Sequence, residues 1–172
     1  DKETAIAAIQ AAMTGHQVYT SLHTNDAIGA IPRLMNIGVP NYLMAGSLIC
    51  VVAQRLARKL CSNCKKEQEI TAEEKHLLGK KYDEVTKIYK AVGCAKCNNS
   101  GYKGRIVIAE ILPFDSELDD MVSASKSRKE ILEYVLSKGF VPMVEDGIHK
   151  VVNGVTDLKE LMRVVDMTDR MN

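Results

Sequence analysis

Four of the five cysteines form two C-x-x-C pairs that are suited to holding one metal ion: Cys61 and Cys64 are followed by Cys94 and Cys97. Each pair can present two sulfurs through a tight turn, and four thiolates at tetrahedral angles suit Zn²⁺. Such a site has no open coordination position, so it stabilises a fold rather than performing catalysis. The spacing therefore predicts a structural zinc centre.

The residues around the two pairs favour a metal, but three other uses of the cysteines stay open. Nearby lysines would offset the charge of four thiolates, and nearby polar side chains can donate hydrogen bonds to sulfur. These residues are Lys59, Lys65, Lys66 and Lys96, and Ser62, Asn63, Asn98 and Asn99. The alternatives are two disulfides, a redox-active pair and an iron–sulfur cluster. The fifth cysteine, Cys50, lies in an apolar run and is predicted to be a small buried side chain.

Two histidines flank a short apolar stretch, residues 17–22, that is predicted to be a buried strand. His16 precedes this stretch and His23 follows it. Ligands collect beyond the carboxyl ends of strands in open α/β sheets, so His23 is the better candidate for a functional residue. A strand of this length would keep the histidines about 20 Å apart, so we do not expect them to share a metal. Each histidine also has a purely structural interpretation.

The elements that would position these residues suggest a mixed α/β chain. The pattern of residues 1–58 predicts a helix from Ala5 that ends at Gly15, followed by the strand at 17–22. It then predicts a helix from Asp26 to Asn36, a short helix after Asn41 and a strand in the later part of 48–60. The capping box Thr71-x-x-Glu74 predicts a helix over 72–78, before a strand over 86–92. A strand at 105–112 is followed by predicted helices from Ser127 to Gly139, at 144–152 and at 158–165.

Composition and charge narrow the class of protein. The chain has 172 residues, 46% hydrophobic and 26% charged, which is typical of a globular protein. Its apolar runs are too short to cross a bilayer, and it has no secretory leader pattern. The net charge is +1, but residues 55–105 hold 13 basic and 6 acidic side chains and so carry +7. Such asymmetry predicts segments with different partners.

Several motifs in order along the chain resemble the secretion ATPases, the motor ATPases of type II secretion and type IV pilus assembly. The matching stretches are Asp1-x-Glu3-Thr4-Ala5, Ala11-Ala12-x-Thr14-Gly15-His16, Ser21-Leu22-His23-Thr24-Asn25, Ala53-Gln54-Arg55-Leu56, the tetracysteine module and Gly101-Tyr102-x-Gly104-Arg105. Their shared order covers essentially the whole chain, which is more specific than any one motif.

This resemblance implies a fold and a set of site residues. The fold is α/β: a partial RecA-like P-loop ATPase core (its C-terminal half) over 1–58, a tetracysteine zinc module over 59–104, and a strand with an α-helical C-terminal domain over 105–172. Asp1 resembles the last residue of a Walker B motif, and His16 and His23 resemble a catalytic histidine box beside the γ-phosphate. Thr24 and Arg55 are implied to bind nucleotide.

The resemblance also implies cofactors and partners, with one departure. It implies ATP and Mg²⁺ in the full-length enzyme, a homo-hexamer, and partners among the inner-membrane platform proteins on the cytoplasmic face. No G-x-x-x-x-G-K-[ST] phosphate loop occurs in the 172 residues, and Gly79-Lys80-Lys81 lacks the hydroxyl residue and the earlier glycine. Since phosphoryl transfer depends on that loop, we expect this chain alone not to hydrolyse ATP.

A zinc-ribbon protein that binds nucleic acid is the alternative function. Lysines surround the cysteines, and Tyr82, Tyr89 and Tyr102 could offer stacking faces for bases. Arginine is sparse in the module, however, and acidic segments flank it. We therefore expect no nucleic-acid partner, and the +7 charge better suits acidic protein domains or anionic lipid headgroups.

Overall fold

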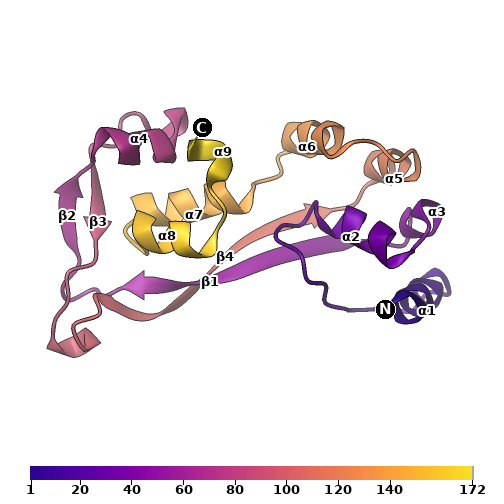
Figure 1. The fold of residues 1–172 in the computed structure, drawn as a ribbon, viewed down its shortest axis with the longest axis horizontal. Coiled ribbons are helices and arrows are strands. Elements are labelled where there is room, and N and C mark those ends of the chain that lie inside the picture. The colour runs from indigo at the N-terminus through magenta and orange to yellow at the C-terminus, as the bar shows by residue number, and fades with distance from the viewer. Residues whose placement is uncertain (172) are drawn as a thin grey trace. The chain divides into compact units, whose positions relative to one another are not determined.

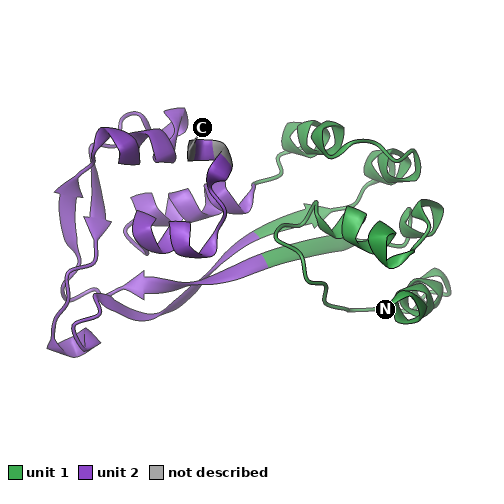
Figure 2. Ribbon diagram, in the orientation of Figure 1, with its two compact units in different colours: residues 1–53, 110–141 green, residues 54–109, 142–172 purple. Residues whose placement is uncertain are grey.

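The computed structural model describes residues 1–171, which divide into two compact units (Figures 1 and 2). Unit 1 comprises Asp1–Ala53 and Glu110–Val141, and unit 2 comprises Gln54–Ala109 and the chain from Pro142 onward. The division falls within β1 (Cys50–Leu60) and β4 (Tyr102–Pro113), which pair as a two-stranded sheet. Both units therefore combine helices with part of this sheet, in agreement with a mixed α/β chain.

Unit 1 is mainly helical. Its helices are α1 (Lys2–Met13), α2 (Ala30–Ile37), α3 (Asn41–Met44), α5 (Ser116–Ser123) and α6 (Arg128–Ser137). The expected capping box opens α6, since the Ser127 hydroxyl accepts from the Glu130 N–H and the Glu130 carboxylate accepts from the Ser127 N–H. The buried apolar side chains include Ile28, Ile31, Met44, Leu112, Leu118 and Val122.

The predicted strand over residues 17–22 is wrong. These residues form neither helix nor strand, and the side chains of Val18 and Tyr19 are 40% and 85% exposed. A strand needs a neighbour with which to exchange backbone hydrogen bonds. The sheets of residues 1–171 are the β1–β4 pair and the β2–β3 pair, and neither includes this stretch. The apolar pattern identified residues that favour a strand but gave no information about a partner.

Two further expectations in unit 1 need correction. The helix predicted from Asp26 starts at Ala30, because the Asp26 carboxylate accepts from the Gly29 N–H (2.7 Å) within a preceding turn. Pro32 then falls in the first helical turn, where its missing N–H costs no hydrogen bond.

Cys50 is exposed rather than buried. It lies on the face of β1 that includes Val52, and the alternate residues 50, 52, 54 and 56 of this strand are all exposed.

Unit 2 contains a hairpin and, among its described residues, four α-helices. The strands β2 (Lys66–Glu69) and β3 (Lys87–Lys90) pair antiparallel, with Glu67 opposite Tyr89. Between them lies α4 (Ala72–Leu78), opened by the predicted capping box of Thr71 and Glu74. The helices α7 (Met143–Val152) and α8 (Leu158–Val164) follow later in the chain, with the short α9 (Thr168–Met171). The side chains of Leu78, Ile88, Ile108, Ile148, Val151 and Leu161 are buried.

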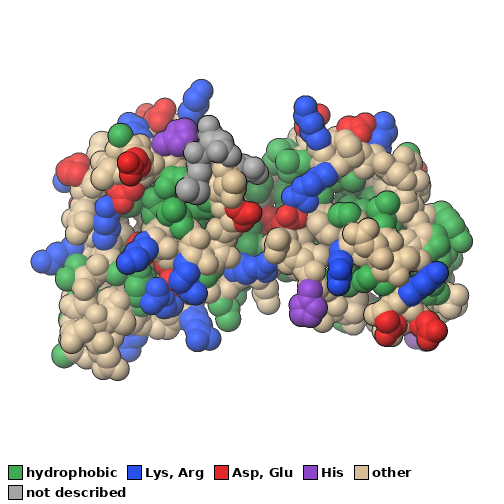
Figure 3. Space-filling view, viewed as in Figure 1, with side chains coloured by type: hydrophobic (Ala, Val, Ile, Leu, Met, Phe, Trp, Pro, Cys, Tyr) green, Lys and Arg blue, Asp and Glu red, His purple; other side chains and the backbone are tan. Residues whose placement is uncertain are grey.

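The surface of unit 2 carries the basic residues that the charge count located. Figure 3 shows Lys and Arg side chains (blue) spread over the part of the molecule that Figure 2 assigns to unit 2.

None of the helices among residues 1–171 combines the length and the hydropathy that a bilayer crossing requires.

Candidate metal centre and the polar network beside it

The four predicted cysteines converge on one point in unit 2. Their sulfur atoms all lie within 4.8 Å of one another, and the Cys64–Cys97 and Cys94–Cys97 Sγ distances are both 3.8 Å. The Cys61–Cys94 Sγ distance is 4.0 Å. Tetrahedral coordination with metal–sulfur bonds of about 2.3 Å places sulfurs about 3.8 Å apart. The four side chains are thus positioned to hold a metal ion, and their spacing fits zinc.

Two similar backbone turns bring each pair together. In the first, the N–H groups of Cys64 and Lys65 donate to the Cys61 carbonyl (3.2 and 2.9 Å). In the second, the N–H groups of Cys97 and Asn99 donate to the Cys94 carbonyl (3.1 and 2.9 Å). These turns orient two sulfurs of each pair toward the same point, as the C-x-x-C spacing predicted.

Polar residues in and beside the turns support the sulfurs in different ways. The Asn63 side-chain amide donates to the Cys94 sulfur (3.4 Å), as expected. Asn98 and Asn99 have positive φ angles of 51° and 59°, a backbone region that asparagine tolerates better than most residues. Both of these asparagines therefore shape the second turn.

Burial and backbone N–H groups act against each other on two of the thiols, and the balance differs between them. Burial by itself would raise the pKa of the Cys97 thiol, but N–H groups of Cys94 (3.2 Å) and Gly101 (3.3 Å) donate to its sulfur and lower the pKa to about 6. Burial dominates at Cys64 and raises the pKa of its thiol to about 11, despite the N–H of Gly93 at 3.3 Å. Because metals bind thiolates, a bound cation would hold Cys64 deprotonated.

Gly101 contacts both cysteine pairs, because its N–H donates to the Cys97 sulfur and its carbonyl accepts from the Cys61 N–H. A substitution at this position therefore tests the geometry of the centre. Gly101 has φ of +79°, and an added Cβ would lie 2.6 Å from the Cβ of Ala91. Gly104 has a similar φ of +81°, but an added Cβ there would meet nothing within 4 Å. We expect Gly101→Ala to cost about 2 kcal/mol more stability than Gly104→Ala, because both variants share the φ penalty and only the first adds a clash. Chemical denaturation of the two variants measures this difference, and equal losses would contradict the close approach.

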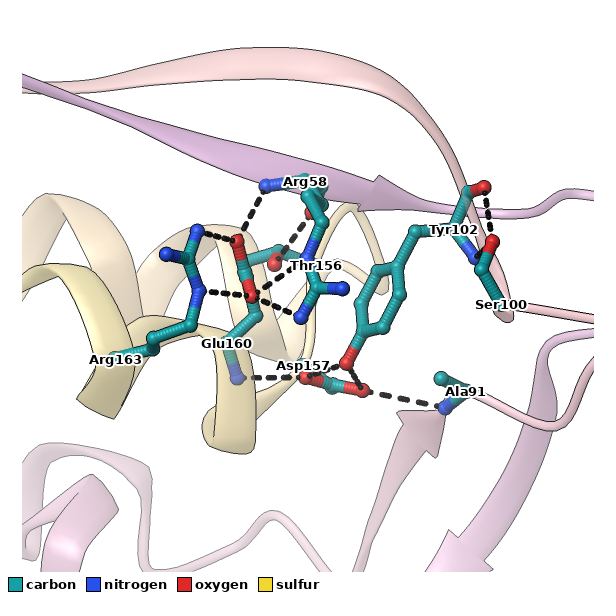
Figure 4. A network of polar contacts seen from close by, with 8 residues as sticks. All are labelled: Arg58, Ala91, Ser100, Tyr102, Thr156, Asp157, Glu160 and Arg163. Carbon is teal, nitrogen blue, oxygen red and sulfur yellow. Dashed lines mark hydrogen bonds and ion pairs between the residues drawn. The ribbon is translucent and has the colours of Figure 1, made fainter. Parts of the chain in front are cut away.

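A buried carboxylate on α8 is held by two arginines (Figure 4). The Glu160 side chain is fully buried, and it accepts hydrogen bonds from the Arg58 Nε (2.9 Å) and Nη2 (2.6 Å) and from the Arg163 Nε (2.9 Å) and Nη2 (2.6 Å). The Arg58 backbone N–H donates to it as well (2.9 Å). Burial opposes the charge of Glu160, but the two arginines outweigh it and lower its pKa to about 2.

A second carboxylate, Asp157, joins the start of α8 to the chain around the cysteines. The Tyr102 hydroxyl donates to both of its oxygens (2.9 and 2.8 Å), and the Ala91 N–H donates to Oδ2 (3.2 Å). Asp157 also caps α8 by accepting from the Glu160 N–H (2.9 Å). The Arg58 guanidinium lies over the Tyr102 ring, 4.0 Å from its centroid. Burial and the bond to Asp157 both raise the pKa of Tyr102.

Sequence reasoning assigned no function to this network. An acidic residue just before the helix predicted at 158–165, such as Asp157, indicates a helix cap and nothing more. The one signal in the sequence is the motif Gly101-Tyr102-x-Gly104-Arg105, and the role that the sequence suggested for Tyr102 was a stacking face for bases rather than a bond to Asp157. The partners are 55 and 102 positions apart along the chain, so spacing alone does not bring them together.

The predicted nucleotide residues of unit 1 lie in its N-terminal part. Asp1 caps α1 by accepting from the Thr4 N–H (2.8 Å). His16 and His23 are exposed, and the Thr14 hydroxyl lies 3.2 Å from the His16 Nδ1. The turn that follows His23 is fixed by Glu110, a buried carboxylate that accepts from the Ala27 N–H.

The other two predicted nucleotide residues belong to different units. Thr24 is half-buried and lies in unit 1, directly after His23. Arg55 lies on β1 within unit 2, and its Nη1 donates to the Gln54 carbonyl (3.0 Å). The nucleotide roles of these residues stay predictions.

The family of the chain follows from its match to known proteins. The family model described as "Type II/IV secretion system protein" matches residues 1–163. The chain belongs to this family. Members similar to it include the type II secretion system ATPase E of Vibrio cholerae, 41% identical over 165 residues, which are 95% of this chain and 32% of that protein.

Family members from pilus assembly are equally similar. The type IV pilus assembly ATPase PilB of Thermus thermophilus is 42% identical over 164 residues, covering 94% of this chain and 18% of that protein. The PilB of Pseudomonas aeruginosa is 43% identical over 166 residues, covering 95% of this chain and 29% of that protein. The chain thus spans a third or less of the length of these relatives, and the expected resemblance to secretion ATPases is confirmed.

Proposed function

We propose that the chain is the C-terminal portion of a hexameric motor ATPase that uses ATP hydrolysis to drive type II protein secretion or type IV pilus assembly. The observation that carries this proposal is the family match over residues 1–163, together with about 40% identity to relatives named as ATPases of both systems. In this proposal the motor works on the cytoplasmic face of the inner membrane, against platform proteins of the secretion or pilus machine.

The four cysteines are proposed to hold a structural Zn²⁺ ion. Sulfur distances near 3.8 Å and four cysteine ligands suit tetrahedral zinc, and two of the sulfurs accept backbone N–H groups that favour thiolates. The ion would supply stability, because four protein ligands leave no position for a substrate. Cys61, Cys64, Cys94 and Cys97 would hold it.

The nucleotide-linked roles in unit 1 are proposed from the motif positions. Asp1 would contribute to Mg²⁺ and ATP binding in the full-length enzyme, with Thr24 and Arg55 near the nucleotide, and His16 and His23 would be the catalytic pair. His23 would donate a hydrogen bond to the γ-phosphate or its water and lose this partner after hydrolysis. The Glu110 carboxylate supports this role, because it fixes the backbone at Ala27, four residues after His23.

The role of His23 is tested in the full-length parent protein. His23→Ala is expected to uncouple ATP hydrolysis from secretion or pilus assembly, because the residue that senses the γ-phosphate is lost, so less substrate is secreted for each ATP hydrolysed. His76→Ala is the matched control, because His76 is an exposed histidine on α4. Unchanged secretion by the His23 variant would refute this role.

The ATPase proposal itself is tested by turnover. The full-length parent is expected to hydrolyse ATP in the presence of Mg²⁺ and to form hexamers with nucleotide, whereas the 172-residue chain is expected to be inactive because it contains no phosphate loop. A parent without turnover would overturn the motor proposal. Detectable turnover by the pure 172-residue chain would overturn its predicted inactivity.

The alternative of a nucleic-acid-binding zinc ribbon loses support from the placement of its tyrosines. The Tyr102 hydroxyl is bound by Asp157 and its ring is covered by Arg58. The Lys65 ammonium lies 4.4 Å from the centroid of the Tyr89 ring. The Lys81 ammonium lies 5.7 Å from the centroid of the Tyr82 ring, so all three candidate stacking rings already have a cationic side chain of the protein beside them.

A further inference from the structure

We propose that Asp157 is a positioning residue for the metal centre: its carboxylate joins the two ends of the chain segment that carries Cys94 and Cys97. This inference rests on the proposal that the four cysteines bind a metal. It concerns a residue outside the ligand set, 60 positions after Cys97 in the sequence.

The contacts of Asp157 exceed what its helix requires. As the cap of α8 it needs only to accept from the Glu160 N–H (2.9 Å). It also accepts from the Ala91 N–H, three residues before Cys94, and from the Tyr102 hydroxyl, five residues after Cys97. Asp157 is 4% exposed, so water does not compete strongly for these bonds.

The segment that Asp157 fixes supplies most of the contacts around the sulfurs. It contains Cys94 and Cys97 themselves, and Gly93, whose N–H donates to the Cys64 sulfur (3.3 Å). It also contains Gly101, whose N–H donates to the Cys97 sulfur (3.3 Å) and whose carbonyl accepts from the Cys61 N–H (2.9 Å). Movement of either end of this segment would therefore displace sulfurs from both pairs.

Because Asp157 holds both ends of the segment in the folded chain, less conformational entropy is lost when the ion binds. A flexible segment must be ordered when the metal binds, and the lost conformational freedom subtracts from affinity. Groups that orient metal ligands from outside the ligand set typically change affinity about 10- to 100-fold when they are removed. The Arg58 guanidinium covers the Tyr102 ring, so the tyrosine is restrained from a second side.

The test compares variants that remove these bonds while keeping the helix cap. In Asp157→Ser the shorter side chain still caps α8, but it no longer reaches Tyr102 and Ala91. Tyr102→Phe removes the hydroxyl alone. The 172-residue chain is loaded with Co²⁺, whose tetrahedral thiolate spectrum reports ligand geometry, or with Zn²⁺. Transfer of the metal to a chromophoric chelator is then followed.

The chain contains a matched pair of controls in unit 1. Asp115 also caps a helix, accepting from the Leu118 N–H (2.9 Å), and it also accepts from a tyrosine hydroxyl, that of Tyr134 (2.7 Å). Asp115→Ser and Tyr134→Phe therefore remove the same chemistry in the unit that lacks the cysteine centre.

The expected result is release of metal about tenfold faster from Asp157→Ser and Tyr102→Phe than from the unmodified chain. The double variant is expected to release metal little faster than Asp157→Ser alone, because the two groups act as one unit. Asp115→Ser and Tyr134→Phe are expected to leave the release rate unchanged. Release from both unit 2 variants at the unmodified rate would overturn the inference. Failure of the unmodified chain to bind metal would overturn the metal proposal itself.

Discussion

Cys97→Ser is expected to abolish stoichiometric zinc binding and to lower the free energy of unfolding of unit 2 by more than about 4 kcal/mol. Cys97 is a buried residue, and its sulfur lies 3.8 Å from those of both Cys64 and Cys94. A serine hydroxyl is a poor zinc ligand, so three thiolates would remain and lose the energy of the closed site. Metal content of the purified variant and chemical denaturation with and without a chelator measure the two effects.

Cys50→Ser is the control for the loss of a cysteine. Cys50 is exposed at the start of β1 and is not among the four cysteines that converge. We expect this variant to retain one equivalent of metal and its stability. If Cys97→Ser retains the metal, or if a chelator leaves the stability of the unmodified chain unchanged, the zinc centre is not structural.

Glu160→Ala is expected to destabilise unit 2 by about 4 kcal/mol, the range found when one partner of a buried ion pair is removed. The carboxylate is fully buried and receives two arginines and the Arg58 N–H, all of which lose their acceptor. The side chains of Arg58 and Arg163 are 43% and 56% exposed, so water partly solvates them in the variant. Thermal and chemical unfolding of the metal-loaded chain measure the loss.

The same carboxylate predicts a dependence of stability on pH. Its pKa is lowered from an ordinary 4.5 to about 2 in the folded protein, because both arginines stabilise the charge against burial. Its contribution is therefore complete above pH 4.5 and is lost as the pH falls toward 2. The difference in stability between the unmodified chain and Glu160→Gln should shrink over this range. Acid release of metal affects both proteins and cancels in the difference.

Glu130→Gln is the control for this titration. The pKa of Glu130 is also lowered to about 2, chiefly by Lys126 and Ser127, but its side chain is 45% exposed. Water screens such a surface pair, so a much smaller effect on stability is expected than for Glu160→Gln. Equal effects of the two substitutions would mean that burial of Glu160 adds nothing.

The parts of the fold that the sequence predicted are those set by local rules. The C-x-x-C turns depend on a few consecutive residues, and the four cysteines that the spacing grouped together do converge. The capping boxes at Thr71 and Ser127 are equally local, and both occur as expected. Helix starts and metal turns can be read from spacing, because the partners are at most four residues apart.

The parts that were missed depend on distant partners. The strand β2, Lys66–Glu69, has four exposed polar residues and no apolar alternation, and it is defined by its pairing with β3. Residues 17–22 show the opposite case. Their composition favours a strand, but no described strand pairs with them. Asp157 and Glu160 were missed because an acidic residue at a helix start is usually only a cap.

The way unit 2 is divided along the chain has a consequence for synthesis on the ribosome. Cys97 is the last cysteine in the chain. The loop and helix that support the cysteines span residues 154–160. Residues 110–141, which belong to unit 1, lie between the two in the sequence and are made before the loop and helix. At ordinary translation rates this delay lasts on the order of several seconds. The thiols therefore leave the ribosome before the α7–α8 region, which contributes Asp157 to the segment that carries Cys94 and Cys97, has been made.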